Sequence, residues 1–205
     1  MKRQLITVGV LMVFGMMSFS ARPLGTEDFG TAERGKSALE WGYNNEQTSA
    51  FVVKHVPLEG VELSAEYEVP VGASFAFDQV VLNVEVNLAK NAFAGLNYGV
   101  KVKYDHLAQT LGLIAIAALE DESYCIHTNT SFEPESPLTF SIAGEWLGFG
   151  SFQPVVEATS TGADINGLIG ARYQVFDGSF VDAAATFPIS GLGTRSQFIG
   201  LTSEF

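Results

Sequence analysis

Apolar and polar residues alternate along most of this 205-residue chain, and the alternation has a period of two. In the stretch DQVVLNVEVNLAK (residues 78–90), every second residue from 80 to 88 is Val or Leu, and every residue between them except Val81 is polar. The stretch VELSAEYEV (residues 61–69) follows the same rule, with Glu and Ser between the apolar residues. Successive side chains of a β-strand point to opposite faces, so this period is typical of half-buried strands and not of helices.

Runs of this kind recur and predict about twelve strands of roughly ten residues, which is the length at which a β-strand crosses a membrane. Strands of soluble proteins are shorter, most often about five or six residues. The second, sixth and eleventh runs alternate poorly, so ten strands is the alternative count. The expected strands are 37–46, 49–58, 60–70, 79–89, 95–105, 109–119, 123–133, 137–147, 151–160, 165–176, 178–188 and 195–205.

The connections between these strands favour a membrane barrel. If the barrel segment starts on the periplasmic side, its odd-numbered connections are the outer loops. These are longer on average and include VGASFAFDQ (71–79) and SGLGTR (190–195), although the first connection, near 45–48, is short. Short periplasmic turns, longer outer loops and an even number of strands are typical of bacterial outer-membrane barrels. We therefore predict an all-β fold, a transmembrane antiparallel up-and-down β-barrel over residues 37–205, with both ends of the barrel segment on the periplasmic side. The even-numbered, shorter connections are EG (59–60), KNAFA (90–94), EDES (120–123), GFGS (148–151) and DG (177–178).

The first twenty residues have the layout of a secretory signal peptide. Lys2 and Arg3 precede an apolar stretch from Leu5 to Met17, and small residues suited to cleavage follow it. The apolar stretch is shorter than the roughly 20 residues that a membrane-spanning helix needs. Residues 21–36 lack alternation, and we expect them to form either a periplasmic leader or a segment in the lumen.

Charge and hydropathy narrow the possible partners. Without residues 1–20, which hold two of the eleven Lys and Arg residues, nine bases face 23 acids and the formal charge is −14. Nucleic acid is excluded as a partner, because phosphate binding needs basic patches. The mean hydropathy is nevertheless +0.20. In a barrel of the bacterial outer membrane, many of these apolar side chains would face lipid. The alternative is a soluble periplasmic β-sandwich or lipocalin-like binding protein, in which they would form the core.

Catalytic and metal-binding motifs are weak. Cys125 and His127 share one face of an expected strand, but two ligands are too few for a closed zinc site. The carboxylates of LEDES (119–123) fit a solvated turn better than a calcium site. We expect no enzymatic activity, no cofactor and no bound metal ion.

Ten charged residues point inward under the alternation, away from lipid, where charge is costly. A barrel of about twelve strands is intermediate between the filled interior of about eight strands and the open pore of about 16–18. We therefore predict a narrow channel for small solutes, in which seven carboxylates against three bases disfavour anions. The alternative is a sealed, non-conducting barrel with a structural or surface role, in which these charges neutralise one another. The ten residues are Glu40, Glu62, Glu66, Glu68, Glu85, Lys101, Lys103, Glu145, Glu157 and Arg172.

The expected last strand ends on an aromatic residue. Ile199, Leu201 and Phe205 share one face, which would place Phe205 in the aromatic girdle at the membrane interface. A terminal Phe also resembles the signature by which outer-membrane barrels are recognised for insertion. We therefore expect the barrel assembly machinery and outer-membrane lipid as partners.

Short motifs near the start of the expected mature chain carry a family resemblance. They are Arg22-Pro23-Leu24, Thr26-Glu27-Asp28, Gly30-Thr31, Glu33, Gly35-Lys36 and the run Leu39 to Tyr43, with Glu66 to Pro70 and Val100 to Tyr104 further on. In these residues the chain resembles an outer-membrane barrel family associated with the phenol meta-degradation pathway, whose members are often called transporters. The resemblance implies a transporter that passes hydrophobic or aromatic compounds.

Overall fold

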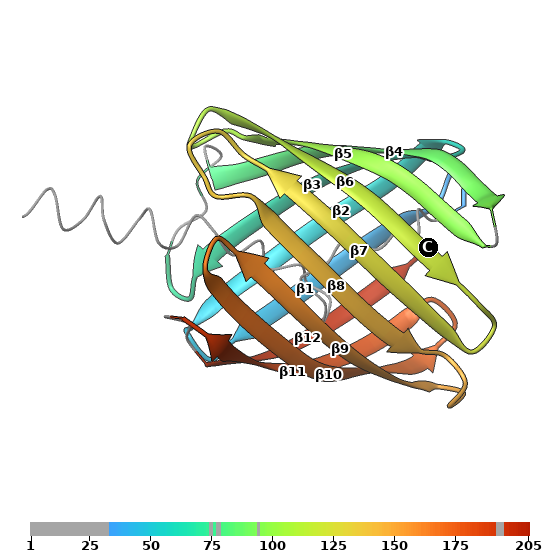
Figure 1. Cartoon of the computed structure of the whole chain (residues 1–205). Coiled ribbons are helices and arrows are strands. Elements are labelled where there is room, and N and C mark those ends of the chain that lie inside the picture. Colours follow the sequence, from blue (N-terminus) through green and yellow to red (C-terminus); the bar gives the residue numbers. More distant parts are fainter. Residues whose placement is uncertain (1–32, 74–75, 77–78, 94, 192–194) are drawn as a thin grey trace, which may run out of the picture.

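The computed structural model describes residues 33–73, 76, 79–93, 95–191 and 195–205, and these residues form a closed barrel of antiparallel strands (Figure 1). Each strand pairs with its neighbours in sequence, and the first pairs with the last. The predicted all-β barrel is confirmed, with twelve strands and not ten. The strands are β1 (Ser37–Asn44), β2 (Thr48–Leu58), β3 (Val61–Pro70), β4 (Val80–Phe93), β5 (Leu96–Asp105), β6 (Thr110–Glu120), β7 (Tyr124–Phe132), β8 (Thr139–Trp146), β9 (Phe152–Thr161), β10 (Asp164–Phe176), β11 (Ser179–Ser190) and β12 (Ser196–Glu204).

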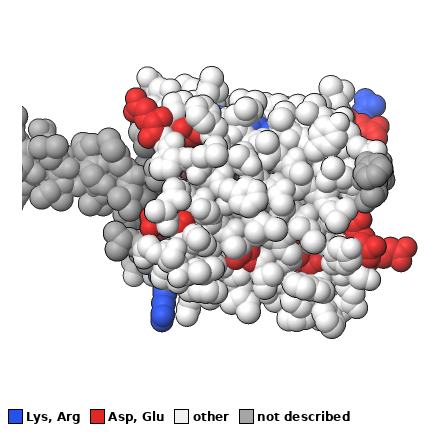
Figure 2. Space-filling model, viewed as in Figure 1, with Lys and Arg blue, Asp and Glu red and all other residues white. Residues whose placement is uncertain are grey.

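The alternation in the sequence becomes an inside and an outside in the barrel. In β4, the side chains of Asn83 and Glu85 are 4% and 5% exposed. Their neighbours in sequence, Leu82 and Val84, are 51% and 42% exposed. The outward side chains are mostly apolar, and Figure 2 shows uncharged side chains across the middle of one face, with charged ones mainly toward the two ends. This is the reverse of a soluble protein and is the arrangement that a barrel in lipid requires. In the part of the chain that is described, no helix is long and apolar enough to cross a membrane.

Aromatic side chains are exposed around the end of the barrel that carries Phe205. Most of them lie within three residues of a strand end or in a connection at that end, and Trp146, for example, is the last residue of β8. Such a ring is typical of the interface between hydrocarbon and lipid headgroups. Its members are Tyr98, Tyr124, Trp146, Phe149, Phe152, Phe176 and Phe205.

The connections differ in length between the two ends. Those at the end with Ser37 and Phe205 have two to five residues, and those at the other end have two to nine. Glycines such as Gly60 and Gly178 adopt positive φ angles of 73° and 69° in two-residue turns, a conformation that costs glycine little. The expectation of a turn at 90–94 is wrong: β4 continues to Phe93, and shifts in its register with β5 beyond Asn87 accommodate the extra residues as bulges.

Hydrogen bonds beyond the ends of β1 and β12 complete the seam of the barrel. Ser37 N donates to Phe205 O at 2.8 Å, and Phe205 N donates to Ser37 O at 2.9 Å. At the opposite end, Asn45 N donates to Gln197 O at 3.0 Å, and Asn45 Oδ1 accepts from Gln197 N at 2.9 Å and from Ser196 Oγ at 3.1 Å. Both edges of the sheet are therefore paired along their full length.

A short turn precedes β1. Lys36 N donates to Glu33 O at 3.0 Å, and Gly35 N donates to Val56 O at 2.7 Å, which ties the turn to β2. The rest of the expected leader, residues 21–32, and the expected signal peptide, residues 1–20, lie outside the described residues.

Changing Phe205 to Asp should block assembly of the barrel, because it puts a carboxylate on the outward register beside Ser37 in place of an aromatic side chain. We expect the variant to lose heat-modifiable migration on unboiled gels. Glu204→Gln, on the neighbouring inward register, should assemble normally. Normal heat-modifiability of the Phe205→Asp variant would show that the aromatic residue has no role in closure.

Labels at positions 84 and 85 should report opposite surroundings. Val84 lies on the outward register and Glu85 on the inward one. A fluorescent label at 84 should be quenched by lipid-borne quenchers, and a label at 85 should not. Val84→Arg should also destabilise the barrel by about 2–4 kcal/mol if it lies near the membrane midplane. A label at 84 that lipid quenchers do not reach would mean that protein, and not lipid, covers this face.

Candidate functional site

The inward face of the barrel is the candidate functional site. Strand pairing places all ten predicted residues on the inward register; for example, Glu62 faces Glu85, and Glu85 faces Lys101. Four of them, Glu40, Glu62, Glu85 and Lys101, are buried, and the others are half-buried except Glu68, which is exposed. The side chains that carry charge are therefore gathered inside the barrel and away from its outer face.

Lys54 organises the first group of charges. Its Nζ lies 3.0 Å from Glu40 Oε1 and 3.8 Å from Glu62 Oε1, so one ammonium group bridges β1, β2 and β3. Lys54 is 8% exposed. Removing one partner of an ion pair that is shielded from water destabilises the fold strongly, because the other partner is left as a buried charge without compensation.

Two further lysines extend this network to β5. Lys101 Nζ lies 3.6 Å from Glu66 Oε1, and Asn83 Nδ2 donates to the same oxygen at 2.9 Å. Lys103 Nζ lies 3.2 Å from Glu133 Oε1 in the connection after β7. We call the inward wall of β1–β5 the ion-paired half; its charged residues include Glu40, Lys54, Glu62, Glu66, Glu68, Glu85, Lys101 and Lys103.

A separate ion pair lies on β10 and β11. Arg172 Nε donates to Asp182 Oδ1 at 3.0 Å, and the two residues face each other in the strand register. The guanidinium carbon of Arg172 also lies 5.0 Å from the centroid of the Phe180 ring. Asp182 is 0% exposed, so this charge depends on its contacts within the barrel wall.

The inward wall of β6–β9 has a different character. Thr159 Oγ1 lies 2.8 Å from Glu157 Oε1 and 3.0 Å from Ser141 Oγ. Apolar side chains pack beside these polar groups in two buried clusters, one on β6 and β7 and the other on β8 and β9. We call this part of the wall, four of the twelve strands, the cation-free wall, because it carries no Lys or Arg. Its inward residues include Ile114, Ile116, Ala118, Cys125, His127, Asn129, Ser141, Ala143, Glu145, Val155, Glu157 and Thr159.

Cys125 and His127 are neighbours on this wall. Cys125 Sγ lies 3.9 Å from His127 Nδ1, and both side chains are buried. Within the described ranges, no group of three or more His, Cys, Asp or Glu residues is arranged to hold a metal ion.

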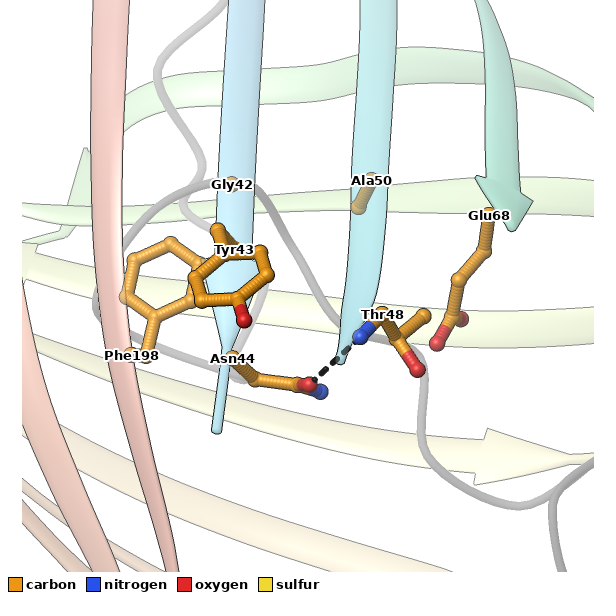
Figure 3. A pocket seen from close by; sticks show the side chains of 7 residues that line it. All are labelled: Gly42, Tyr43, Asn44, Thr48, Ala50, Glu68 and Phe198. Carbon is orange, nitrogen blue, oxygen red and sulfur yellow. Dashed lines mark hydrogen bonds between the residues drawn. The ribbon is translucent and has the colours of Figure 1, made fainter. Parts of the chain in front are cut away.

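A shallow recess lies at the mouth of the barrel opposite Phe205. Figure 3 shows Glu68 and Phe198 reaching it from β3 and β12, with Gly42 and Ala50 between them. Asn44 Oδ1 shapes its edge by accepting from Thr48 N at 3.0 Å. Glu68 is an exposed residue at this mouth.

Sequence reasoning missed Lys54 and Asp182. Lys54 lies in the run AFVVKHV, where apolar residues occupy both faces and hide the alternation. Asp182 could have been found, because it is the only charged residue of β11 and charge on a lipid-facing register is costly.

Comparisons with known proteins bear on the fold. No family model matches the chain, and no curated protein matches it by sequence. One solved structure that it resembles is the KdgM porin in complex with disordered oligogalacturonate. The identity is 9%, the match covers 83% of this chain and 99% of the other, and the TM-score is 0.62. A second structure, of the KdgM porin, matches with 9% identity, the same coverage and a TM-score of 0.61. The NanC porin is also similar, with 10% identity over 82% of this chain and 98% of the other and a TM-score of 0.59. At these identities the likeness shows a porin-type barrel fold.

Replacing Lys54 by Met should destabilise the barrel by about 3–5 kcal/mol, because the buried carboxylates of Glu40 and Glu62 lose the ammonium group that each contacts. Denaturant unfolding of the protein refolded in lipid vesicles measures the change. The double variant Lys54→Met, Glu40→Gln should recover part of the loss, because it removes one of the two carboxylates. A loss below about 1 kcal/mol, the usual value for an exposed pair, would contradict a shielded network.

Proposed function

We propose that this protein is an outer-membrane channel for small solutes that disfavours anions. The observation that carries the proposal is the charge balance of the inward wall. When the first and last residue of each strand are left out, described carboxylates outnumber described bases by eight to four on this wall. The carboxylates are Glu40, Glu62, Glu66, Glu68, Glu85, Glu145, Glu157 and Asp182, and the bases are Lys54, Lys101, Lys103 and Arg172.

The outer face supports a location in the outer membrane. Apolar side chains form its band, and exposed aromatic residues ring one end. The layout of residues 1–20 as an export signal, and the fold shared with porins, agree with this location. Lipid and the barrel assembly machinery are the proposed partners, and we assign the barrel no catalytic role.

The resemblance to the phenol meta-degradation family supports a narrower proposal, the passage of hydrophobic or aromatic compounds. The motifs that carry it lie mainly in residues 22–43. The buried apolar clusters on the inward wall of β6–β9 are consistent with solutes of this kind. We propose that residues 21–36 act as a periplasmic leader or a lumen segment of the same channel.

A second candidate is a non-conducting barrel with a structural or surface role. The burial of inward charges favours it, because Asp182, Lys101 and Glu40 are only 0%, 2% and 3% exposed. Charges that neutralise one another out of contact with water would suit a sealed interior.

Planar-bilayer recordings separate the two candidates. Under a KCl gradient, the refolded and heat-modifiable protein should conduct, with a reversal potential that favours potassium over chloride. Glu145→Lys should move this potential toward chloride, because one inward carboxylate becomes a base. Thr130→Ser, on the outward register of β7, should leave it unchanged. Absence of conductance would support the sealed barrel, and a preference for chloride would overturn the proposed selectivity.

A further inference from the structure

Glu133 belongs to a connection between strands, and yet its side chain reaches into the barrel. It directly follows β7, in the connection to β8 at the mouth opposite Phe205. Its Oε1 lies 3.2 Å from Nζ of Lys103, which is on the inward register of β5. The side chains of Lys103 and Glu133 are 14% and 33% exposed, so this ion pair lies at the mouth and is only partly shielded from water.

A glycine makes this contact possible. Lys103 faces Gly112 in the register of β5 and β6. A Cβ atom at position 112 would lie 3.0 Å from Cγ and 3.4 Å from Oε1 of Glu133. The Glu133 side chain therefore crosses the inner face of β6 at a residue that has no side chain, and it meets Lys103 on the strand beyond. A larger residue at position 112 would stand between the two charged groups.

The longest connection at this mouth, 71–79, is tied to a different surface. The hydroxyl of Tyr67, on the outward register of β3, donates to Gln79 Oε1 at 3.3 Å and accepts from Ala76 N at 3.1 Å. Among the described residues of the connections at this mouth, only Glu133 forms an ion pair with an inward lysine. The contact between Glu133 and Lys103 therefore distinguishes the β7–β8 connection from the others.

The charges near this mouth give the contact a consequence. Lys101 Nζ lies 3.6 Å from Glu66 Oε1. Glu68 lies nearer the end of β3 and is exposed, and no described residue forms a hydrogen bond or an ion pair with it. The carboxylates of Glu66, Glu68 and Glu133 against two lysine ammonium groups give a net charge of −1. Without Glu133 the net charge would be zero, because the ammonium group of Lys103 would then offset Glu68.

We propose that Glu133 sets the charge selectivity of the mouth opposite Phe205. Its carboxylate holds the ammonium group of Lys103 against the wall of β5 and β6, and small cations enter past the exposed carboxylate of Glu68. Charged side chains that line an entrance select ions in this way. The inference rests on the proposed channel function and names a residue that determines its selectivity, one that comes from a connection and not from a strand.

Planar-bilayer recordings under a KCl gradient test this role. Glu133→Gln should lower the ratio of potassium to chloride permeability by about two- to fourfold, because one unit charge at roughly 8 Å in water changes the local concentration of each ion about twofold. Glu135→Gln is the matched control and should change the ratio much less, since it removes the same charge from an exposed residue of the same connection. Equal effects of the two variants, or an unchanged ratio in Glu133→Gln, would overturn the proposal.

A variant that changes no charge tests the geometry. Gly112→Val should move the ratio in the same direction as Glu133→Gln, because the new side chain separates Glu133 from Lys103. Heat-modifiable migration on unboiled gels shows that the variant has assembled. A ratio equal to that of the parent protein would mean that the contact over β6 does not govern selectivity.

A disulfide reports the position of Glu133 without any current. In a Cys125→Ser background, copper phenanthroline with oxygen as the electron acceptor oxidises the thiols of the double variant Gly112→Cys, Glu133→Cys, and mass spectrometry detects the loss of one hydrogen atom from each. The bond should form readily, because a Cβ atom at position 112 already lies close to the side chain of residue 133. The control Gly112→Cys, Glu135→Cys should form little. Absence of the bond between positions 112 and 133 would overturn the proposal.

The two readouts separate the failures. A disulfide in a barrel that conducts, together with an unchanged selectivity in Glu133→Gln, would overturn the role of Glu133 but not the channel. A disulfide in a barrel that passes no current would overturn the proposed channel and leave the contact of Glu133 with Lys103 standing.

Discussion

The hydrogen-bonded pairing of β1 with β12 is the interaction on which the rest of the structure depends. In hydrocarbon no water can satisfy a backbone N–H or C=O group, and each one left unpaired costs several kcal/mol. A sheet with two free edges would therefore not be stable there. Closure through Ser37 and Phe205 at one end, and through Asn45 and Gln197 at the other, removes both edges. Once the ring is closed, every strand has a fixed inner and outer face.

That fixed inner face sorts the charges of the chain. Charged side chains lie inside, because they would be costly against lipid. On β1–β5 the inward wall holds ion pairs, and on β6–β9 it has no Lys or Arg. The division follows directly from the sequence, since neighbouring strands of an up-and-down barrel are also neighbours in the chain. A long stretch without Lys or Arg therefore becomes a continuous side of the barrel interior.

Much of the fold could be predicted because the period of two is clear where one face is polar, as in β3 and β4. It was obscured in β2 and β6, where apolar residues lie on both faces of the sheet, and this is why Lys54 was missed. The extension of β4 to Phe93 was not predictable, since bulges follow from pairing with β5 and leave no local signal. For the candidate site, alternation indicated the direction of the ten charged residues. Partners such as Glu40 with Lys54 depend on the register between the two neighbouring strands and on side-chain reach.

The central claim is that the barrel spans a membrane through its apolar outer band. Polarised infrared spectroscopy of the protein refolded into oriented lipid bilayers tests it most directly, because the dichroism of the amide bands reports strand orientation. We expect strands tilted by about 35–45° from the bilayer normal, as in membrane barrels. Amide bands without dichroism, or protein that remains in the aqueous phase when lipid is present, would contradict the account.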